Sequence, residues 1–183
     1  MPNLLLLDRD GTLTQNKVRP GDYINDPSEL ELIPGVLERL QNYRDRGWEL
    51  AILSNQGGIE KGFTSLDKVI AGMKRTMVLT GGMIEWVWFC PSAYPGRGET
   101  AFRVGVVDGF ESWNHCTSFA QHGYRKPCPG MALAAMAWFR VQPTDQVVFV
   151  GDRPEDGAMA INAGLEFIDA ADWREGKVPS GCL

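Results

Sequence analysis

The sequence predicts an α/β protein with a doubly wound, mainly parallel β-sheet of the Rossmann-like type, covered by helices on both faces. Short apolar segments alternate along the chain with longer amphipathic ones, and this alternation is typical of parallel strands joined by helices. Polar residues follow several apolar segments directly, at the edge where such sheets bind ligands. For 183 residues we expect one domain, residues 1–183, with a small insert at about 91–124.

The first half of the chain supplies alternating strands and helices. The run Leu4–Leu7 is too short and too uniformly apolar for an amphipathic helix, so we expect a buried strand. Residues 14–33 carry several Pro, Gly and Asn turn signals, which predict a polar loop. A helix is then opened by Pro34-Gly35 and stopped by Gly47, with an apolar face formed by Val36, Leu37, Leu40 and Tyr43. The next expected elements are a strand at 48–53, a helix at 65–79 and a strand at 84–89.

The segment 91–124 interrupts this alternation because it is rich in Gly and aromatic residues. Asp108-Gly109, between residues 101–107 and 110–113, predicts a hairpin turn. Two interpretations remain open for its aromatic side chains, a satellite core or a flat wall at a substrate entrance; they are Tyr94, Phe102, Phe110, Trp113 and Phe119. The elements expected after it are a helix at 129–140, a strand at 146–150, a helix at 154–163 and a strand at 165–168.

Composition limits the classes of function. The net charge of −5 provides no basic surface for long nucleic acids, although a short nucleic-acid end remains a possible substrate. The N-terminal apolar run ends after four residues at Asp8, so we expect neither a signal peptide nor a membrane span, and a cytoplasmic protein. No phosphate-binding G-x-x-x-x-G-K-[ST] motif occurs, which argues against a kinase half.

Two carboxylates follow the first expected strand. Asp8 and Asp10 are two residues apart, and side chains at this spacing point to the same side of a strand. Like charges held this close need a cation or a proton between them. The alternative is a strand followed by an ordinary Asp/Gly turn, so the pair alone does not establish a site.

Further polar residues are expected at the same edge of the sheet. Ser54 follows the second strand, Asp152 follows the 146–150 strand, and Lys126 lies in the loop before a helix. These residue types suit phosphoryl transfer, in which one carboxylate attacks phosphorus and a second transfers protons. Mg²⁺ favours carboxylate oxygens, and a lysine and a hydroxyl can bind the charged equatorial oxygens.

The ordered motifs resemble those of the haloacid dehalogenase (HAD) superfamily. Within it they are similar to the branch that holds histidinol-phosphate phosphatases, heptose-bisphosphate phosphatases and polynucleotide 3'-phosphatase modules. The resemblance spans about residues 4–168, and four motifs in order are more specific than any one alone. The motifs are Asp8-Arg9-Asp10-Gly11-Thr12, Ser54-Asn55-Gln56, Arg125-Lys126-Pro127-Cys128-Pro129-Gly130-Met131 and Gly151-Asp152-Arg153-Pro154-Glu155-Asp156.

This resemblance implies catalytic and metal-binding roles. Asp8 would be the nucleophile and a metal ligand, and Asp10 the general acid/base, whose backbone carbonyl also binds the metal. Lys126 would offset the charge of nucleophile and phosphate. Asp152 would complete a Mg²⁺ site, and Asp156 would orient Lys126 or a metal-bound water. The simpler alternatives are helix caps for Asp152 and Asp156 and a solvated surface position for Lys126.

The resemblance also implies a set of residues on the substrate side. Ser54 would bind the phosphoryl group with help from the Asn55 backbone, and Thr12 would support the nucleophile loop. Apart from the resemblance, Arg97, Arg103 and Arg125 could meet a second phosphate or a phosphodiester. The alternative is a solvated surface position, which we favour for Arg97 and Arg103. The alternative for Ser54 is an ordinary turn residue.

One part of the chain departs from the pattern of these relatives, many of which carry a zinc loop of Cys-x-His and Cys-x-Cys. Here Ser92, two residues after Cys90, stands where the pattern has His, and His122 and Tyr124 occupy the second pair of positions. Structural zinc requires four ligands, and only two of these residues could serve. We therefore expect Mg²⁺ and no zinc.

The leading hypothesis is a Mg²⁺-dependent phosphomonoesterase that works through an aspartyl-phosphate on a small metabolite, a sugar phosphate or histidinol phosphate. The alternative is a 3'-phosphatase acting on nucleic-acid ends, favoured by an open site. A third, less favoured hypothesis is a non-catalytic phosphate-binding protein. The 14–33 loop is too short for a large helical cap, and the sequence does not predict the oligomeric state.

Overall fold

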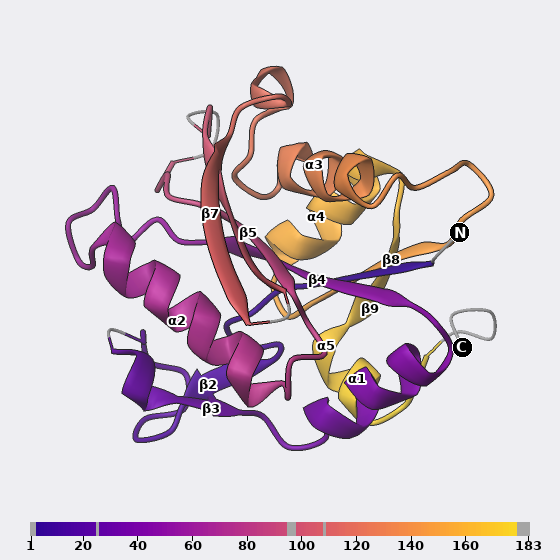
Figure 1. The fold of residues 1–183 in the computed structure, drawn as a ribbon, viewed down its shortest axis with the longest axis horizontal. Coiled ribbons are helices and arrows are strands. Elements are labelled where there is room, and N and C mark those ends of the chain that lie inside the picture. The colour runs from indigo at the N-terminus through magenta and orange to yellow at the C-terminus, as the bar shows by residue number, and fades with distance from the viewer. Residues whose placement is uncertain (1–2, 25, 95–97, 108, 179–183) are drawn as a thin grey trace.

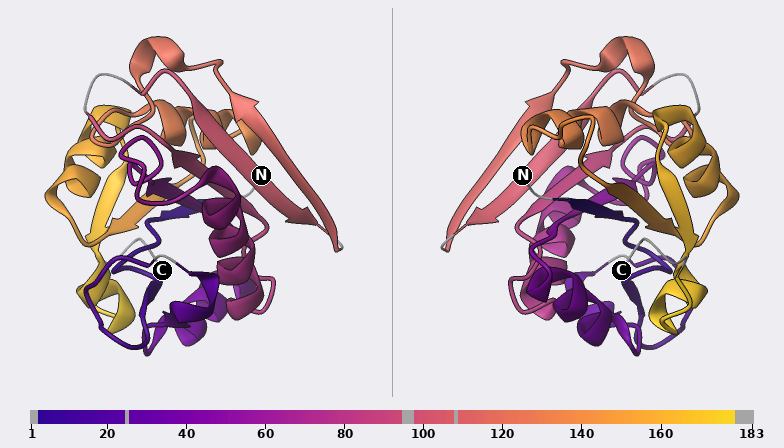
Figure 2. Two further views of the ribbon diagram at one scale, coloured as in Figure 1. Left: turned by 90° about the vertical axis from the view of Figure 1, so that its left-hand side faces the viewer. Right: turned by 90° about the vertical axis from the view of Figure 1, so that its right-hand side faces the viewer.

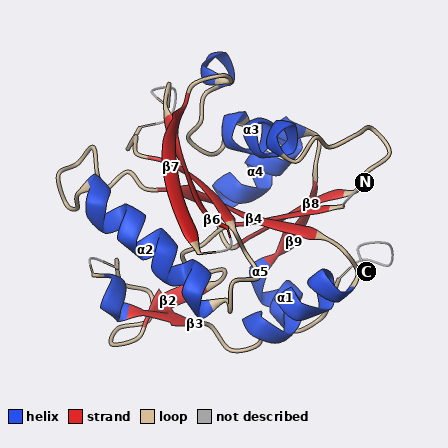
Figure 3. Cartoon of the chain, in the orientation of Figure 1, coloured by secondary structure: helices blue, strands red, loops and turns tan. Residues whose placement is uncertain are grey.

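The protein, in a computed structural model, is built on a seven-stranded sheet of order β7-β6-β5-β4-β1-β8-β9 (Figures 1 and 3). The structure describes residues 3–24, 26–94, 98–107 and 109–178. Five neighbouring strands are parallel, namely β5, β4, β1, β8 and β9, while β6 pairs antiparallel with β5 and β7 antiparallel with β6. The strands are β1 (Leu4–Leu7), β4 (Glu49–Asn55), β5 (Trp86–Cys90), β6 (Ala101–Val107), β7 (Phe110–Cys116), β8 (Val147–Gly151) and β9 (Glu166–Asp169). This arrangement confirms the predicted α/β class.

The central position of β1 explains its uniform composition. Leu4 pairs with Glu49 of β4 on one side and with Val147 of β8 on the other. All four leucines are fully buried, because a parallel strand in the middle of a sheet is covered on both faces. The strand therefore delivers Asp8 to the interior of the carboxyl edge.

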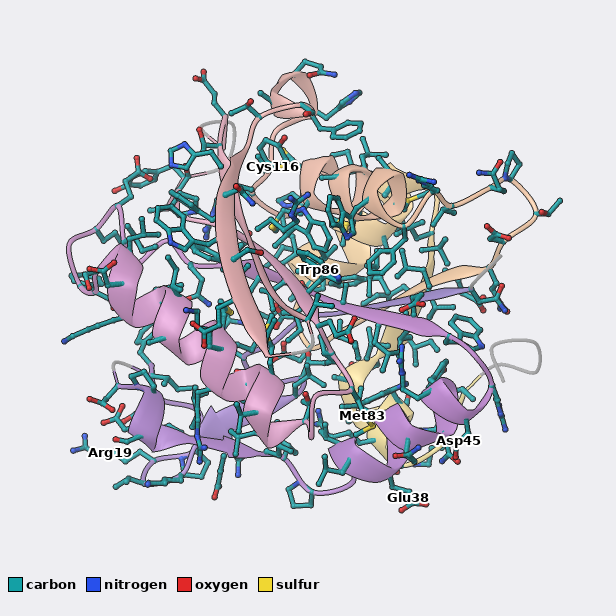
Figure 4. The ribbon with its side chains drawn as sticks, in the orientation of Figure 1. Arg19, Glu38, Asp45, Met83, Trp86 and Cys116 are labelled. Atoms are coloured by element: carbon teal, nitrogen blue, oxygen red, sulfur yellow. The ribbon has the colours of Figure 1, made fainter. Side chains whose placement is uncertain are left out.

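Helices cover both faces of the sheet and enclose two apolar clusters. α1 (Val36–Asp45), α2 (Leu66–Leu79) and α5 (Ala170–Arg174) lie on one face, and α3 (Gly130–Trp138) and α4 (Pro154–Ala163) on the other (Figures 1 and 2). Leu5 and Leu7 face the first group, whereas Leu4 and Leu6 face the second, as the two-residue period of a strand requires. Met83, labelled in Figure 4, packs against the first of these clusters, on the same face of the sheet as α1.

The insert extends the sheet as a β-hairpin, as predicted. Val107 of β6 pairs with Phe110 of β7, and the two strands project from the body of the molecule in Figure 2. Phe102 is buried and stacks on Phe89 with ring centroids 5.3 Å apart, which supports the satellite core. Trp113 and Tyr94 remain about half exposed, at 48% and 53%. Arg97 and Asp108 lie outside the described residues.

The return segment of the insert is organised by a buried tyrosine at a position where relatives are expected to carry a zinc ligand. The Tyr124 hydroxyl accepts a hydrogen bond from the Phe119 amide at 2.8 Å and lies 3.5 Å from Cys116 Sγ. Burial raises the pKa of this hydroxyl, with Cys116 adding to the effect. Within the described ranges no group of three or more His or Cys side chains could hold one ion. The absence of zinc stays a prediction.

Two expectations about local structure were wrong, and one helix was not predicted. Residues 14–33 are not only loop, because β2 (Thr14–Asn16) pairs antiparallel with β3 (Leu30–Leu32) after the short 3-10 helix Pro27–Glu29. Leu37 is 48% exposed, and Arg39 is buried on the α1 face instead, since residue 39 lies three positions from Val36 and 37 only one. Helix α5 had no predicted counterpart.

The described part of the chain contains no helix that is long and apolar enough to cross a membrane.

Candidate active site

The functional residues expected from the sequence meet at the carboxyl edge of three neighbouring strands. Asp8 follows β1, Ser54 lies near the end of β4, and Asp152 follows β8. Asp8 and Ser54 are buried, with 6% and 1% of their surface exposed, whereas Asp152 is exposed. Lys126 reaches the same place from the loop before α3 and is only 3% exposed. A buried serine, aspartate and lysine at one edge are not ordinary turn residues.

The turn after β1 is shaped by Gly11. This glycine has φ +89° and lies so close to Asp152 that a Cβ atom would be 2.3 Å from its Oδ2. Only glycine adopts this conformation without strain and permits such a close approach. The Thr12 hydroxyl donates to Asp152 Oδ1 at 3.5 Å, so Thr12, predicted on the substrate side, contacts the metal-site carboxylate. The turn thereby joins the first motif to the fourth.

Arg174 of helix α5 stabilises the same turn. Arg174 Nη1 donates to the carbonyl oxygens of Gly11 at 3.1 Å and Thr12 at 2.9 Å. These carbonyls would otherwise lack partners in a tight turn. Sequence reasoning missed Arg174, since nothing in its local sequence connects it to a turn over 160 residues away.

Lys126 lies at the centre of a buried charge cluster. Its Nζ is 2.6 Å from Asp8 Oδ1, 2.6 Å from Asp156 Oδ1 and 3.1 Å from the Leu53 carbonyl oxygen. Three acceptors match the three N–H donors of an ammonium group. The predicted surface alternative for Lys126 is therefore wrong, and the predicted contact with Asp8 is present.

Asn55 fixes the backbone that carries this lysine. Its amide nitrogen donates to the Lys126 carbonyl at 3.1 Å, and its Oδ1 accepts from the Lys126 amide at 3.0 Å. The peptide bond from Lys126 to Pro127 is cis, and Asn162 of α4 donates to the Pro127 carbonyl at 3.0 Å. The Asn55 side chain thus positions Lys126.

Asp156 combines the two roles that the sequence left open. Its Oδ2 accepts from the Arg153 amide at 3.1 Å, which caps the N-terminus of α4. Its Oδ1 pairs with Lys126. Gly151 makes room for it, because a Cβ there would lie 2.5 Å from the Asp156 Cβ. One buried carboxylate therefore anchors both the helix and the lysine.

Burial and charge shift the ionisation of the cluster. Burial raises the pKa of Asp8 to about 7, although Lys126 opposes this effect. Burial alone would lower the pKa of Lys126, but Asp8 and Asp156 outweigh it, so that pKa is raised and the ammonium stays charged. Burial followed by the neighbouring Asp156 also raises the pKa of Asp152. The cluster contains more carboxylates than cations, so an additional positive charge there would stabilise the ionised carboxylates.

The carboxylates fit a divalent cation. Asp8, Asp152 and Asp156 each offer an oxygen within 4.8 Å of the others. Hard oxygen donors of this kind suit Mg²⁺, and the glycine at position 11 allows Asp152 to lie close to the turn that carries Asp8 and Asp10. Asp10, predicted to contribute its backbone carbonyl, lies in the same turn.

Two residues that sequence reasoning did not assign contact the expected acid/base. Arg9 donates from Nε and Nη2 to the two oxygens of Asp10 at 2.9 and 2.8 Å. Gln56 donates from Nε2 to Asp10 Oδ2 at 2.9 Å and to Ser54 Oγ at 2.9 Å. The two-residue spacing of Ser54 and Gln56 was a signal, because it places both on one side of the strand end.

Arg125 points to a different neighbourhood. Its Nη1 donates to the Ser92 carbonyl at 2.6 Å, and a Cβ at Gly57 would lie 3.1 Å from the same nitrogen. Arg125 therefore joins the insert to the loop after β4. Its proposed contact with a second phosphate stays a prediction.

The sequence of this chain is similar to those of known phosphatases. The family model described as polynucleotide kinase 3 phosphatase matches residues 3–159. A D-glycero-D-manno-heptose-1,7-bisphosphate 7-phosphatase of Thermosynechococcus vestitus is 34% identical over 164 residues, which cover 87% of this chain and 74% of that protein. A D-glycero-β-D-manno-heptose-1,7-bisphosphate 7-phosphatase of Pasteurella multocida is 28% identical over 159 residues, covering 85% and 74%.

A solved structure shares the fold. The D,D-heptose 1.7-bisphosphate phosphatase from B. bronchiseptica, crystallised with magnesium and phosphate, superposes with a TM-score of 0.67 at 23% identity and covers 90% of this chain and 78% of that one. At this identity the likeness concerns the arrangement of strands and helices.

Proposed function

The chain belongs to the polynucleotide kinase 3 phosphatase family of the HAD superfamily and is a phosphatase, and we propose that it hydrolyses the phosphomonoester of a small sugar phosphate through an aspartyl-phosphate. The observation that carries this proposal is the buried Asp8 carboxylate held at 2.6 Å by Lys126. A carboxylate fixed at the edge of a sheet, next to a hydroxyl and a cation, suits nucleophilic attack on phosphorus.

The first step uses the two aspartates of the β1 turn. Asp8 Oδ attacks phosphorus, and the bond from phosphorus to the leaving oxygen breaks. Asp10 gives its proton to that oxygen as general acid. Ser54 donates its hydroxyl to an equatorial oxygen, where negative charge accumulates, and the Lys126 ammonium, whose donors are engaged by Asp8, Asp156 and the Leu53 carbonyl, acts through its charge.

A Mg²⁺ ion fits this site. Asp8, Asp152 and the Asp10 backbone carbonyl would hold it, and Asp156 would complete the acidic set. When bound, Mg²⁺ neutralises the carboxylates and the phosphate dianion together. Lys126, which pairs with Asp8 Oδ1 and Asp156 Oδ1, would offset the remaining charge.

A sugar phosphate is the substrate class that the similar proteins support, since the curated relatives described above are heptose-bisphosphate 7-phosphatases. The net charge of −5 is unfavourable for binding nucleic acid. The family model carries a polynucleotide name, so a 3'-phosphorylated oligonucleotide belongs in the test as a competing substrate.

The test compares kcat/KM across heptose 1,7-bisphosphate, hexose phosphates, histidinol phosphate and a 3'-phosphorylated oligonucleotide. We expect a sugar phosphate to lead by about tenfold or more, the scale of one or two well-placed polar contacts. Asp8→Asn should abolish hydrolysis of every substrate, and chelation of Mg²⁺ should do the same reversibly. Asp45→Asn, on the surface at the end of α1 (Figure 4), is the matched control. Undiminished hydrolysis by Asp8→Asn would refute the mechanism.

A further inference from the structure

The Asp10 carboxylate is held by three N–H donors. Arg9 donates Nε to Oδ1 and Nη2 to Oδ2, and Gln56 donates Nε2 to Oδ2. An ionised carboxylate offers about four acceptor positions. Within the described chain, the hydrogen bonds to Asp10 use one position on Oδ1 and both on Oδ2. One acceptor position on Oδ1 therefore remains, and about a third of the side chain is exposed (33%).

The residues that hold Asp10 are themselves held from two directions. The Arg9 guanidinium is buried against α2, with Nη1 3.6 Å from Met73 Sδ. Gly72 on the same helix leaves it room, because a Cβ there would lie 3.2 Å from Nη1. Gln56 is tied to β4 through the buried Ser54 hydroxyl. The orientation of Asp10 is thus set jointly by contacts with β4 and α2, both of which are distant from Asp10 in sequence.

A purely stabilising role accounts poorly for this arrangement. An ion pair with a partly exposed carboxylate contributes little to stability, because solvent screens it. Burying an arginine to make such a pair costs desolvation. Two parallel hydrogen bonds, by contrast, fix the plane of a carboxylate.

We propose that Arg9 and Gln56 are positioning residues that direct the remaining acceptor position of Asp10 Oδ1 at the water that hydrolyses the aspartyl-phosphate. In that step the water oxygen bonds to phosphorus, and its proton passes to Asp10 Oδ1. The bond between phosphorus and Asp8 Oδ breaks, and its electron pair returns to the Asp8 carboxylate. This inference rests on the proposed function, because it concerns the second half of the same reaction.

The experiment separates the two halves of the reaction with p-nitrophenyl phosphate, whose leaving group needs no proton. For such a substrate kcat/KM reports formation of the phosphoenzyme, and kcat reports its hydrolysis when that step is slow. We expect Arg9→Met to lower kcat about 100-fold, the scale of general base catalysis, and to leave kcat/KM within about threefold. Gln56→Leu should show the same pattern at about tenfold, since it removes one hydrogen bond to Asp10 rather than the two that Arg9 makes.

A direct readout is the accumulation of phosphoenzyme. In rapid-quench experiments Arg9→Met and Gln56→Leu should release a burst approaching about one equivalent of p-nitrophenol, with phosphate trapped on the protein. Arg9→Lys keeps the charge but cannot form two parallel bonds, so it should restore only part of kcat. Arg46→Met, an exposed arginine at the end of α1, is the matched control and should behave as wild type.

Each outcome decides the question. Equal losses of kcat and kcat/KM without trapped phosphate would overturn the proposal and assign Arg9 to folding or substrate binding. If Arg9→Met does not fold, judged by circular dichroism, the half-buried Gln56 carries the test alone. Absence of phosphoenzyme in every variant, with activity retained by Asp8→Asn, would instead refute the proposed function itself.

Discussion

Lys126→Met is the substitution for which the structure makes the strongest quantitative prediction. The ammonium group is buried and has oxygen atoms of Asp8, Asp156 and Leu53 at 2.6, 2.6 and 3.1 Å. Methionine has a similar length and no charge, so it fills the space and removes the cation. Two buried carboxylates would then face each other without compensation.

The expected cost follows from the burial of both partners. Removing one member of a buried ion pair destabilises a protein by about 3–5 kcal/mol. For a chain of 183 residues, each kcal/mol shifts Tm by about 2–4 °C, so the metal-free variant should melt about 10 °C below wild type. Part of the loss should be recovered in Lys126→Met/Asp156→Asn, because one of the two stranded charges is gone, although that variant also weakens the cap of α4.

The measurement is the free energy of unfolding by urea, in EDTA and in Mg²⁺, with Lys61→Met as an exposed control. Mg²⁺ should raise the stability of Lys126→Met more than that of wild type, since it supplies the missing positive charge. With Mg²⁺ present, activity should fall at least about 100-fold relative to wild type, because a cation next to the transferring phosphoryl group is lost. A loss of stability below about 1 kcal/mol would show that the cluster is solvated, as exposed pairs are.

Three further predictions concern other parts of the site and the insert. Because burial raises the pKa of Asp8 to about 7, the metal-free fold binds a proton that the unfolded chain has lost. The stability of the metal-free protein should therefore fall as pH rises from about 4 to 7. The increase in Tm on adding Mg²⁺ should be larger at about pH 8 than at about pH 5.5, and equal increases at the two pH values would contradict the raised pKa of Asp8. Gly11→Ala should weaken Mg²⁺ binding at least about tenfold by calorimetry, because backbone strain at positive φ adds to the clash with Asp152; unchanged affinity would contradict the tight turn. Tyr124→Phe should cost about 1–3 kcal/mol in urea, because the Phe119 amide loses its acceptor, and added zinc should not restore it; recovery with zinc would show a metal site in the insert.

Much of the site could be predicted because its residues follow from local rules. The apolar run Leu4–Leu7 specifies a buried central strand, and a strand that ends there must deliver Asp8 to the carboxyl edge. Asp8 and Asp10 are two residues apart after the first strand, and Ser54 and Asp152 are placed by the ends of other strands. All four residues are therefore expected at one edge of the sheet. The polar chemistry of the site was therefore readable from spacing within single elements.

Other features depend on residues that meet only through folding. Arg9 contacts Asp10 and Met73, and nothing in the first motif indicates that α2 will pack against it. Leu37 and Arg39 differ by two positions, and the packing of α1 against α5, not hydrophobicity, decides which one is buried. Pairing of β2 with β3 was missed because turn residues dominate the composition of that segment.

The order of the motifs, the carboxylate chemistry and the alternation of strands and helices are properties of the linear chain, since each arises from residues a few positions apart. Other features depend on contacts across as many as 141 positions. These contacts decide which carboxylate Lys126 neutralises and which one Arg9 and Gln56 hold. They also bring Gly11 against Asp152. Charges interact through space, and their pKa values follow burial and distance rather than spacing. The unequal environments of Asp8 and Asp10 are for that reason a consequence of the folded molecule.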